Sequence, residues 1–410
     1  MDALSAWQTQ VSTHLPHLSR PQAAVLAAWS FATVCLQHCG RTRCATFLAA
    51  LLDQQAPAVE QRLREWYCQA PAKKGTPRQE LAVTTCFGPL LAWVLAHWPA
   101  NLPQMALALD VTYLGGRFMV LAVSVVYCGT ALPVAWAVLP GQQKAAWHPH
   151  WVRLLTTLAP VVPADWIVLV LADRGLYSTR LFRVVTGLGW HPFFRLRAVG
   201  PYQRAAGGPW RDLRTVLRGP GQCWAGRVRC FRNPEGQVVA TLLARWDAPH
   251  AEPWLILTDL APAAADATWY GLRAGIEGGF KDLKRGGWHW EQTKLRAAAR
   301  VERYWLVLAV AQLYAVLLDA GAPPAPDRAG DELPAGHIAR RTRRRAAPVR
   351  RLSVQTRGVV VGLAALLRGQ APELGGLHPP PWPGQAPVLA ALTALLHQPA
   401  PYRVRDSIKT

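Results

Sequence analysis

With 410 residues the chain is longer than one hydrophobic core usually supports, so we expect two or three domains. Its 45 Lys and Arg residues outnumber its 24 Asp and Glu residues, which gives a formal net charge of +21. This excess favours a polyanionic partner such as nucleic acid. A genomic bias towards Arg would raise the charge as well, but it would not gather the charge into the clusters described below.

The sequence argues against a secreted or membrane-anchored protein. Its start, MDALSAWQTQ, lacks the basic-then-apolar pattern of a signal peptide, and its eight cysteines form no CxxC pair. The apolar run 118–139 is interrupted by Gly129 and Pro133, and the run 305–318 is too short to span a bilayer. We therefore expect a cytoplasmic protein, with residues 305–318 in a buried helix.

Residues 1–98 are predicted to form a helical domain. Candidate helices cover residues 21–38, a segment that starts after Thr42 as N-cap, and residues 59–68. The break at 39–43 resembles a helix-turn-helix, with Arg41 and Arg43 near a helix N-terminus. Two readings stay open for this domain: contact with DNA, or a plain helical bundle.

From residue 105 the pattern changes to strands alternating with helices. The apolar run from Met105 is predicted to be a buried strand and ends in Asp110. Residues 167–171 are predicted to be a second buried strand, and Asp173 lies at its C-terminal end. Further strands are predicted at 117–127, 132–138 and 191–197, with a turn at 129–130, and helices at 147–158 and 178–186. This order predicts a mixed α/β sheet with helices packed on it. One Asp after a strand is often only a turn residue, but two in one sheet form a more specific arrangement.

The segment YGLRAGIEGGFKDLKR, residues 270–285, is predicted to be a helix with a chemical stripe. At about 100° per residue, one side carries a tyrosine, a carboxylate and three cations, namely Tyr270, Arg273, Glu277, Lys281 and Lys284. Incidental charge on a surface helix is the alternative. The glycines at 275, 278 and 279 are costly in a helix interior, so we expect them to allow close approach of the sheet or of DNA.

Three carboxylates, Asp110, Asp173 and Glu277, are predicted to converge on one site. Unpaired carboxylates repel each other in a partly buried site, and hard divalent cations relieve this repulsion. Mg²⁺ suits such an oxygen ligand set, and two ions can promote displacement at a phosphodiester. The sequence therefore predicts two Mg²⁺ ions, with Mn²⁺ as a substitute.

Two other regions carry concentrated positive charge. A β insertion at about 198–260 is rich in arginine and contains Trp210, Trp224, Trp246 and Trp254, which could stack on a displaced base or belong to the core. The region 319–410 holds nine arginines between positions 340 and 368, and a short apolar helix is predicted at 388–396. We assign this C-terminal region to DNA contact or dimerisation.

The spacing Tyr270-x2-Arg273-x3-Glu277-x6-Lys284 matches the YREK signature of bacterial DDE transposases of insertion sequence family four. The stretches LALDVTYLGG around Asp110 and VLADRGLYS around Asp173 resemble that family's first and second catalytic motifs. The resemblance covers about residues 100–300. It implies an RNase-H-like catalytic domain, here residues 99–318, with a β insertion before the glutamate helix.

The resemblance also implies roles for individual residues. Asp110, Asp173 and Glu277 would be the catalytic and metal-binding triad. Tyr270, Arg273 and Lys284 would bind DNA phosphates, with Lys281 and Arg174 as further DNA contacts. The partners would be double-stranded DNA, both the terminal inverted repeats of the element and the target, and a second copy of the chain in the synaptic complex. Such a protein would act at the bacterial nucleoid.

The function expected from this resemblance is cut-and-paste transposition, by metal-dependent phosphodiester hydrolysis and strand transfer. Two alternatives stay open. One is a transposase-derived DNA-binding protein that no longer reacts, although all three carboxylates are present. The other is an RNase-H-like nuclease without strand transfer.

Overall fold

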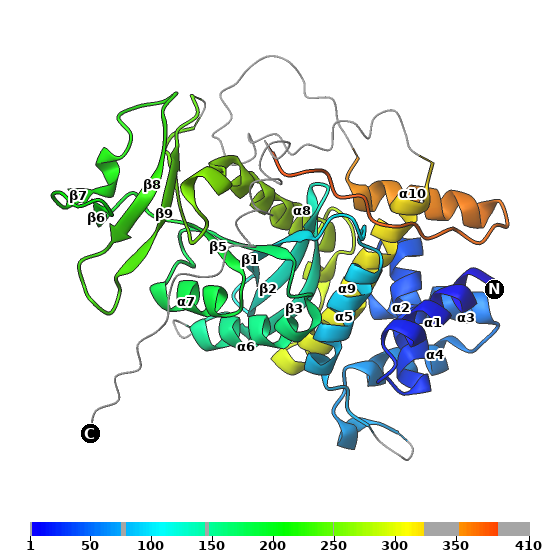
Figure 1. Cartoon of the computed structure of the whole chain (residues 1–410). Coiled ribbons are helices and arrows are strands. Elements are labelled where there is room, and N and C mark those ends of the chain that lie inside the picture. The colour runs from blue at the N-terminus through cyan, green and yellow to red at the C-terminus, as the bar shows by residue number, and fades with distance from the viewer. Residues whose placement is uncertain (1, 75–78, 144–146, 249, 324–351, 384–410) are drawn as a thin grey trace.

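The computed structural model describes residues 2–74, 79–143, 147–248, 250–323 and 352–383 (Figure 1). The chain begins with the helical region predicted for residues 1–98. Its helices are α1 (Asp2–His14), α2 (Arg20–Leu36), α3 (Arg41–Leu52), α4 (Ala56–Trp66) and α5 (Phe87–Ala96), with short 3-10 turns η1 (Ala70–Ala72) and η2 (Val83–Cys86) before α5.

The bend between α2 and α3 measures 100°, which is within the range of helix-turn-helix units. The prediction of Thr42 as N-cap is wrong. Gly40 takes that position, because the ring Nδ1 of His38 accepts the Gly40 N–H at 2.8 Å and turns the chain earlier. Thr42 lies inside α3 and its hydroxyl donates to Glu60 at 3.2 Å.

One ten-stranded sheet is the centre of the described chain. Its strands are β1 (Gln104–Leu114), β2 (Phe118–Tyr127), β3 (Thr130–Pro140), β4 (Ile167–Ala172), β5 (His191–Arg195), β6 (Pro201–Arg204), β7 (Arg211–Asp212), β8 (Cys223–Cys230), β9 (Val238–Arg245) and β10 (Trp254–Thr258). The order is β3-β2-β1-β4-β5-β10-β9-β8-β6-β7. β1 pairs in parallel with β4, and β4 with β5, while the remaining pairings are antiparallel. This mixed α/β sheet with its flanking helices confirms the predicted RNase-H-like fold class.

The turn between β2 and β3 lies one residue earlier than predicted. Cys128 (φ 41°) and Gly129 (φ 78°) both adopt left-handed conformations, as a tight hairpin turn requires. Thr130 therefore already belongs to β3.

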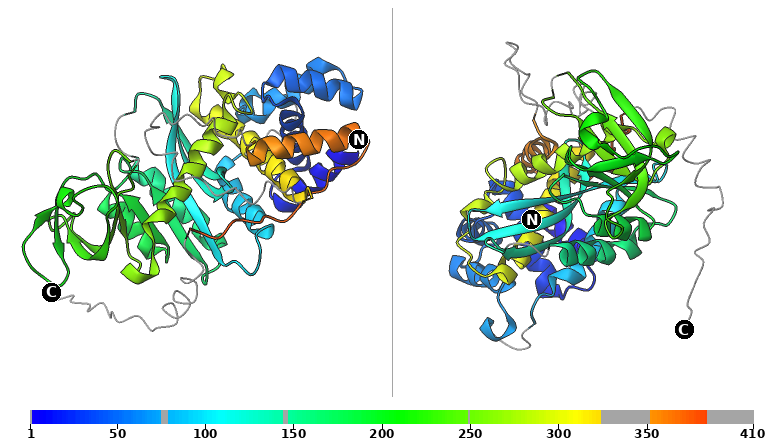
Figure 2. Two further views of the ribbon diagram at one scale, coloured as in Figure 1. Left: turned by 90° about the horizontal axis from the view of Figure 1, so that it is seen from above. Right: turned by 90° about the vertical axis from the view of Figure 1, so that its left-hand side faces the viewer.

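The predicted insertion extends the sheet rather than forming a separate layer. β10 pairs with β5, and β9, β8, β6 and β7 continue outward from it. These strands form a lobe at the end of the molecule that lies away from the N-terminal helices (Figures 1 and 2). The short 3-10 turn η4 (Leu213–Thr215) lies within this lobe.

Helices cover both faces of the central strands. α6 (His148–Leu158), followed by the 3-10 turn η3 (Ala159–Val161), and α7 (Thr179–Gly187) lie on one face, and α8 (Ala274–Leu283) lies on the other (Figure 1). Ser178 caps α7 by accepting the N–H of Leu181. Between β10 and α8 the chain forms the 3-10 segments η5 (Pro262–Ala264) and η6 (Ala267–Arg273), and η7 (Trp290–Gln292) follows α8.

The apolar helix α9 (Ala298–Gly321) is longer than the predicted run 305–318. Its 24 residues and apolar composition would suit a membrane span, but 89% of its apolar window is buried inside the protein. It packs against α2, β3 and α10. The predicted buried helix is therefore confirmed, and its extra length comes from turns at both ends.

The described C-terminal region consists of α10 (Val354–Leu367) and an extended strap over residues 370–383. Part of the basic stretch predicted as a DNA-contacting arm is thus a packed helix, in which Arg357 pairs with Asp319 at 3.0 Å. Residues 340–351 and the helix predicted at 388–396 lie outside the described residues.

Candidate active site

Asp110 and Asp173 reach the same side of the sheet because of strand alternation. In β1 the small residues Ala106 and Ala108 face α8, and Asp110 follows two residues later on that face. In β4, Leu169 and Leu171 lie on the same face of the sheet, towards η6, and Asp173 is the next residue in the alternation.

The register between β1 and β4 brings the two aspartates to one level. Leu109 is the parallel partner of Ala172, so Asp110 and Asp173 both directly follow the last paired residues. Adjacent strands lie about 4.8 Å apart, which makes these side chains neighbours. Asp173 follows the end of β4 as predicted. Asp110 does not end its strand, because β1 continues to Leu114 as a hairpin with β2; it marks the end of the parallel pairing instead.

The predicted single helix 270–285 consists of two elements. Residues up to Arg273 form the 3-10 segment η6, and α8 begins at Ala274. A 3-10 helix has three residues per turn, so an α-helical wheel misplaces the side chains of its first part. Tyr270 and Arg273 are buried and point towards the carboxylates, while Glu277 and Lys281 are exposed. The prediction of one continuous α-helix is therefore wrong for Tyr270 and Arg273, which belong to the 3-10 segment.

Arg273 joins two of the three carboxylates. Its guanidinium donates to Asp110 Oδ2 at 2.6 Å and to Glu277 Oε1 at 3.1 Å. The arginine side chain is 7% exposed, compared with 53% for Glu277. Burial raises the pKa of Asp110 while the nearby Arg273 lowers it, and Glu277 and Asp173 add to the upward shift. The three acids are thus close enough to influence one another.

Asp173 is held by groups from three elements. Its Oδ1 accepts the Arg174 N–H at 2.7 Å and the hydroxyl of Tyr270 at 3.2 Å. Burial, ahead of all other causes, raises the pKa of Tyr270, so its hydroxyl stays protonated and can donate. Arg195, at the end of β5, lies 3.9 Å from the same carboxylate oxygen.

The outer residues of the predicted site have different surroundings. Arg174 pairs with Glu252 at 2.6 Å. Lys284 donates to the carbonyl of Tyr113 at 3.1 Å, and burial lowers its pKa. Lys281 is exposed on α8. Of the predicted residues, the structure therefore gathers Asp110, Asp173, Tyr270, Arg273 and Glu277 into one cluster, with Arg174 and Lys284 at its edges.

Two residues of this cluster, Arg195 and Glu252, were not predicted from the sequence. Arg195 follows Phe193 in the alternation of β5 and is level with Asp173, so the same strand-end argument could have identified it. Glu252 accepts from both Arg174 and Arg195, at 2.6 and 2.7 Å. It lies in a loop of the insertion, and no local pattern marks it.

The donor chemistry of the cluster fits a hard divalent ion, since three carboxylates from three elements share one face of the sheet. Within the described ranges, however, no group of three or more His, Cys, Asp or Glu side chains is arranged to hold a metal. Arg273 supplies the positive charge between Asp110 and Glu277. The carboxylates would need to exchange these contacts for a metal ion.

Comparison with known proteins agrees with this geometry. Residues 112–314 match the family model described as "Transposase DDE domain". This part of the chain is therefore similar to transposase DDE domains. The match begins just after Asp110 and ends in α9, so it includes Asp173 and the whole segment from Tyr270 to Lys284.

A solved structure described as a piggyBac transposase synaptic complex with hairpin DNA is similar at 10% identity and a TM-score of 0.35, over 83% of this chain and 78% of that one. No curated protein sequence matches the chain.

The four tryptophans of the insertion fall into two groups. Trp254 is buried and packs edge-on against Tyr270, so it belongs to the core. The other three are partly exposed, and the guanidiniums of Arg232 and Arg204 lie 5.6 Å from the rings of Trp210 and Trp224. Trp246 donates to the carbonyl of His250.

Proposed function

We propose that the chain is a DNA transposase that cuts an insertion sequence at its terminal inverted repeats and joins it to target DNA. The observation that carries the proposal is the convergence of Asp110, Asp173 and Glu277 on one face of the sheet. Residues 112–314, which include Asp173 and Glu277, match the transposase DDE family model. Its finer assignment to insertion sequence family four rests on the YREK spacing of Tyr270, Arg273, Glu277 and Lys284.

The proposed chemistry is phosphodiester displacement. Water attacks the phosphorus at the element's end, the bond to the 3′ oxygen breaks, and a free 3′-hydroxyl and a 5′-phosphate result. That hydroxyl then attacks a phosphodiester of the opposite strand, which forms a hairpin at the element's end and releases the 3′-hydroxyl of the flanking strand. Hydrolysis of the hairpin restores the 3′-hydroxyl of the element, which then attacks a phosphodiester of target DNA and displaces a 3′-hydroxyl there. Divalent ions, which we take to be two Mg²⁺, would activate the attacking oxygen and stabilise the leaving oxygen.

The residues of the site would bind the ions, orient the carboxylates and contact the DNA. Asp110, Asp173 and Glu277 would hold the ions through their carboxylate oxygens. The buried Tyr270 hydroxyl fixes the orientation of Asp173. Arg273, released from the carboxylates, would be free to contact a phosphate beside the scissile bond, with Lys284 next to it.

One observation favours a second candidate function. Because Arg273 already pairs with Asp110 and Glu277, the chain could be a transposase-derived protein that binds DNA without cutting it. The presence of all three carboxylates supports the active enzyme instead.

A plasmid assay separates the candidates. Purified protein with Mg²⁺ and DNA carrying the element's own ends should release the element and insert it into a target plasmid. The Asp110→Ala variant should bind the same DNA and produce neither product. Cleavage without captured ends would identify a nuclease, and binding without cleavage by the unaltered protein would identify the inactive relative. Copies of the chain are expected to pair two ends as a homodimer, which cross-linking on DNA would show.

A further inference from the structure

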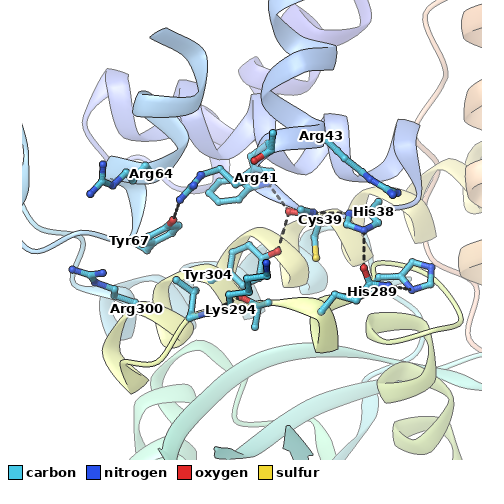
Figure 3. A pocket seen from close by; sticks show the side chains of 16 residues that line it. His38, Cys39, Arg41, Arg43, Arg64, Tyr67, His289, Lys294, Arg300 and Tyr304 are labelled. Atoms are coloured by element: carbon cyan, nitrogen blue, oxygen red, sulfur yellow. Dashed lines mark hydrogen bonds between the residues drawn. The ribbon is translucent and has the colours of Figure 1, made fainter. Parts of the chain in front are cut away.

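A second site lies between the N-terminal helices and the catalytic domain. It is a cavity of about 590 Å³, a size typical of pockets that hold small ligands (Figure 3). One wall comes from the turn between α2 and α3 and from the end of α4. The opposite wall comes from residues 289–295, which follow the catalytic helix α8, and from the start of α9.

The lining is strongly cationic. It includes five Lys and Arg side chains, two histidines and not one Asp or Glu; the cations are Arg41, Arg43, Arg64, Lys294 and Arg300. Arg64 and Arg300 face each other from opposite walls at one end, and Arg43 lies near the histidines at the other end (Figure 3). Gathering like charges in this way costs free energy unless an anion neutralises them.

Most of these cations have no anionic partner in the part of the chain that the structure describes. Arg41 is engaged by Glu60 at 3.0 Å. Among the described residues, no hydrogen bond or ion pair is found for the side chains of Arg43, Arg64, Lys294 or Arg300. The N-terminus of α3 also lines the cavity, and no side chain caps it. The positive end of the helix dipole therefore adds to the positive charge of the lining.

The floor of the cavity is rigid. The carbonyl of Cys39 accepts hydrogen bonds from the Trp29 indole at 3.0 Å and from the Tyr304 hydroxyl at 2.9 Å. The Cys39 N–H donates to the Trp288 carbonyl at 2.9 Å, which ties the two walls together. The positive charges are therefore held on a preorganised frame rather than on a loose surface.

The cavity is also linked to the catalytic site. Arg117, in the turn between β1 and β2, donates to the carbonyls of Thr293 and Leu295 at 2.8 and 3.1 Å. β1 carries Asp110, and α8, which carries Glu277, leads directly into the wall formed by residues 289–295. DNA held at both places would be held by one connected unit.

We propose that this cavity binds backbone phosphates of the DNA whose scissile bond lies at the carboxylates. The inference rests on the proposed function and adds a second anchoring point to it. Contact would be with phosphates rather than bases, because five of the lining side chains are Lys or Arg and none is Asp or Glu. Such contacts position DNA without reading its sequence.

The test compares two double variants that remove the same charge. Arg64→Gln with Arg300→Gln alters the cavity, whereas Arg62→Gln with Arg296→Gln alters exposed arginines that do not line it, one on the same helix α4 and one just before α9. Binding of a labelled DNA duplex of arbitrary sequence is measured over a range of salt concentrations. Each lost phosphate contact should reduce the salt slope by about 1, so the cavity pair should lose about 2 and the control pair should match the unaltered protein.

Equal slopes for the two double variants would overturn the proposal. A second result would also overturn it. If calorimetry shows that the unaltered protein binds ATP, and the Arg64→Gln, Arg300→Gln variant loses ATP binding but binds the duplex normally, the cavity is a site for a soluble nucleotide. Loss of duplex binding by the cavity pair in a protein that never cuts DNA would keep the cavity assignment and reject the proposed function. If the protein cuts DNA in a way that depends on Asp110, but the cavity double variant has an unchanged salt slope, the proposed function stands and the cavity assignment is rejected.

Discussion

Arg273 is the residue on which the state of the carboxylate cluster depends. Its side chain is nearly inaccessible, and it neutralises Asp110, whose side chain is 21% exposed, at 2.6 Å. The contact with Glu277 adds less, since that carboxylate is half exposed and screened by water. The arginine therefore stabilises the site without a metal and competes with any cation that the acids would bind.

Replacing Arg273 should reveal this competition. Arg273→Ala leaves a largely buried Asp110 without its counter-charge, so the free energy of unfolding should fall by about 2 kcal/mol. Mn²⁺ should then raise the melting temperature more in the variant than in the unaltered protein, because the acids have lost their internal cation. Arg174→Ala, which breaks an exposed pair, serves as control and should cost less than about 1 kcal/mol. If Mn²⁺ raises the melting temperature of Arg273→Ala and of the unaltered protein by the same amount, Arg273 does not compete with a metal ion for the carboxylates.

Much of the site could be predicted from single residues, and the errors have physical causes. Asp173 stands directly after its strand, where an apolar run meets a polar residue. Asp110 follows a similar run, but its strand continues because the next residues pair with β2, and a hairpin partner leaves no trace in local composition. Tyr270 and Arg273 were assigned to one α-helix with Glu277 because sequence periodicity does not separate a 3-10 segment from the α-helix that follows it.

At the scale of elements, the glycines of α8 explain how close the helix lies to the sheet. A Cβ atom at Gly275 would stand 2.7 Å from the Thr130 carbonyl oxygen, and one at Gly279 would stand 2.7 Å from that of Ala131. Gly278 meets the Gly129 carbonyl oxygen even more closely. Of the two predicted reasons for these glycines, the sheet is the one observed. Glu277 depends on this contact for its position.

Substitution at this contact should displace the helix. Gly279→Ala forces a methyl group against rigid backbone, so we expect a loss of about 1–3 kcal/mol in unfolding free energy together with reduced cleavage. Gly187→Ala, at the end of α7 where no atom lies within 4 Å of the new Cβ, provides the control. It should leave stability unchanged or slightly raised. Similar losses in the two variants, measured by denaturant unfolding, would show that close packing is not the cause.

Asp282 connects α8 to three neighbouring elements. It accepts from Thr130 on β3 at 2.9 Å, and from Gln312 on α9 and Ser353 at the start of α10 at 3.4 Å each. Burial raises the pKa of this carboxyl to about 6 despite these hydrogen bonds. A buried acid with a raised pKa stabilises the fold when protonated and loses that contribution on ionisation.

The pH dependence of stability should show this group. The pKa rises from 3.8 in the unfolded chain to about 6 in the folded one, and one pKa unit is worth about 1.4 kcal/mol. The protonated Asp282 therefore contributes fully to the free energy of unfolding below pH 3.8. This contribution, about 3 kcal/mol, is lost as the pH rises to about 6. In Asp282→Asn this decline should be absent. Urea unfolding of both proteins from pH 4 to pH 7 measures the difference, and parallel curves would contradict the assignment.

At the scale of the whole molecule, the C-terminal strap ties the ends of the fold together. Leu377 donates its N–H to the His97 carbonyl at 2.7 Å, and His378 donates its N–H to the Tyr127 hydroxyl at 3.2 Å. Further along, Trp382 packs on Trp269, with ring centroids 5.1 Å apart. The Trp269 indole donates to the Pro383 carbonyl at 2.8 Å. The strap therefore reaches η6, immediately before Tyr270.

Removing the large side chain of the strap should loosen the catalytic segment. Trp382→Ala leaves a cavity beside Trp269, and truncating a buried tryptophan costs about 3–5 kcal/mol. Hydrogen exchange should increase most in residues 267–273, and cleavage should fall. Leu367→Ala, at a side chain that is 89% exposed, is the control and should change neither. Unchanged exchange in η6 would show that the strap does not support the site.

Long-range features mark the limit of what this sequence predicts. The succession of strands and helices from β1 to β5, the strand-end position of Asp173 and the buried helix α9 follow from periodicity and from apolar runs. The strap, the loop that supplies Glu252 and the cavity between the two domains depend on contacts between residues far apart in the chain. The helical domain was predicted, but the hydrogen bond from the Cys39 N–H to the Trp288 carbonyl, which joins this domain to the segment after α8, carries no local signal.

The most direct test of the account is DNA cleavage by three single variants, Asp110→Asn, Asp173→Asn and Glu277→Gln, each of which removes a charge and keeps the shape. Asp53→Asn, at an exposed helix end in a left-handed conformation that asparagine accepts, is the matched control. With Mg²⁺ and DNA carrying the element's ends, each of the three variants should lose cleavage while still binding DNA, and the control should cut like the unaltered protein. Normal cleavage by any one of the three would contradict the assignment of these carboxylates as the catalytic centre.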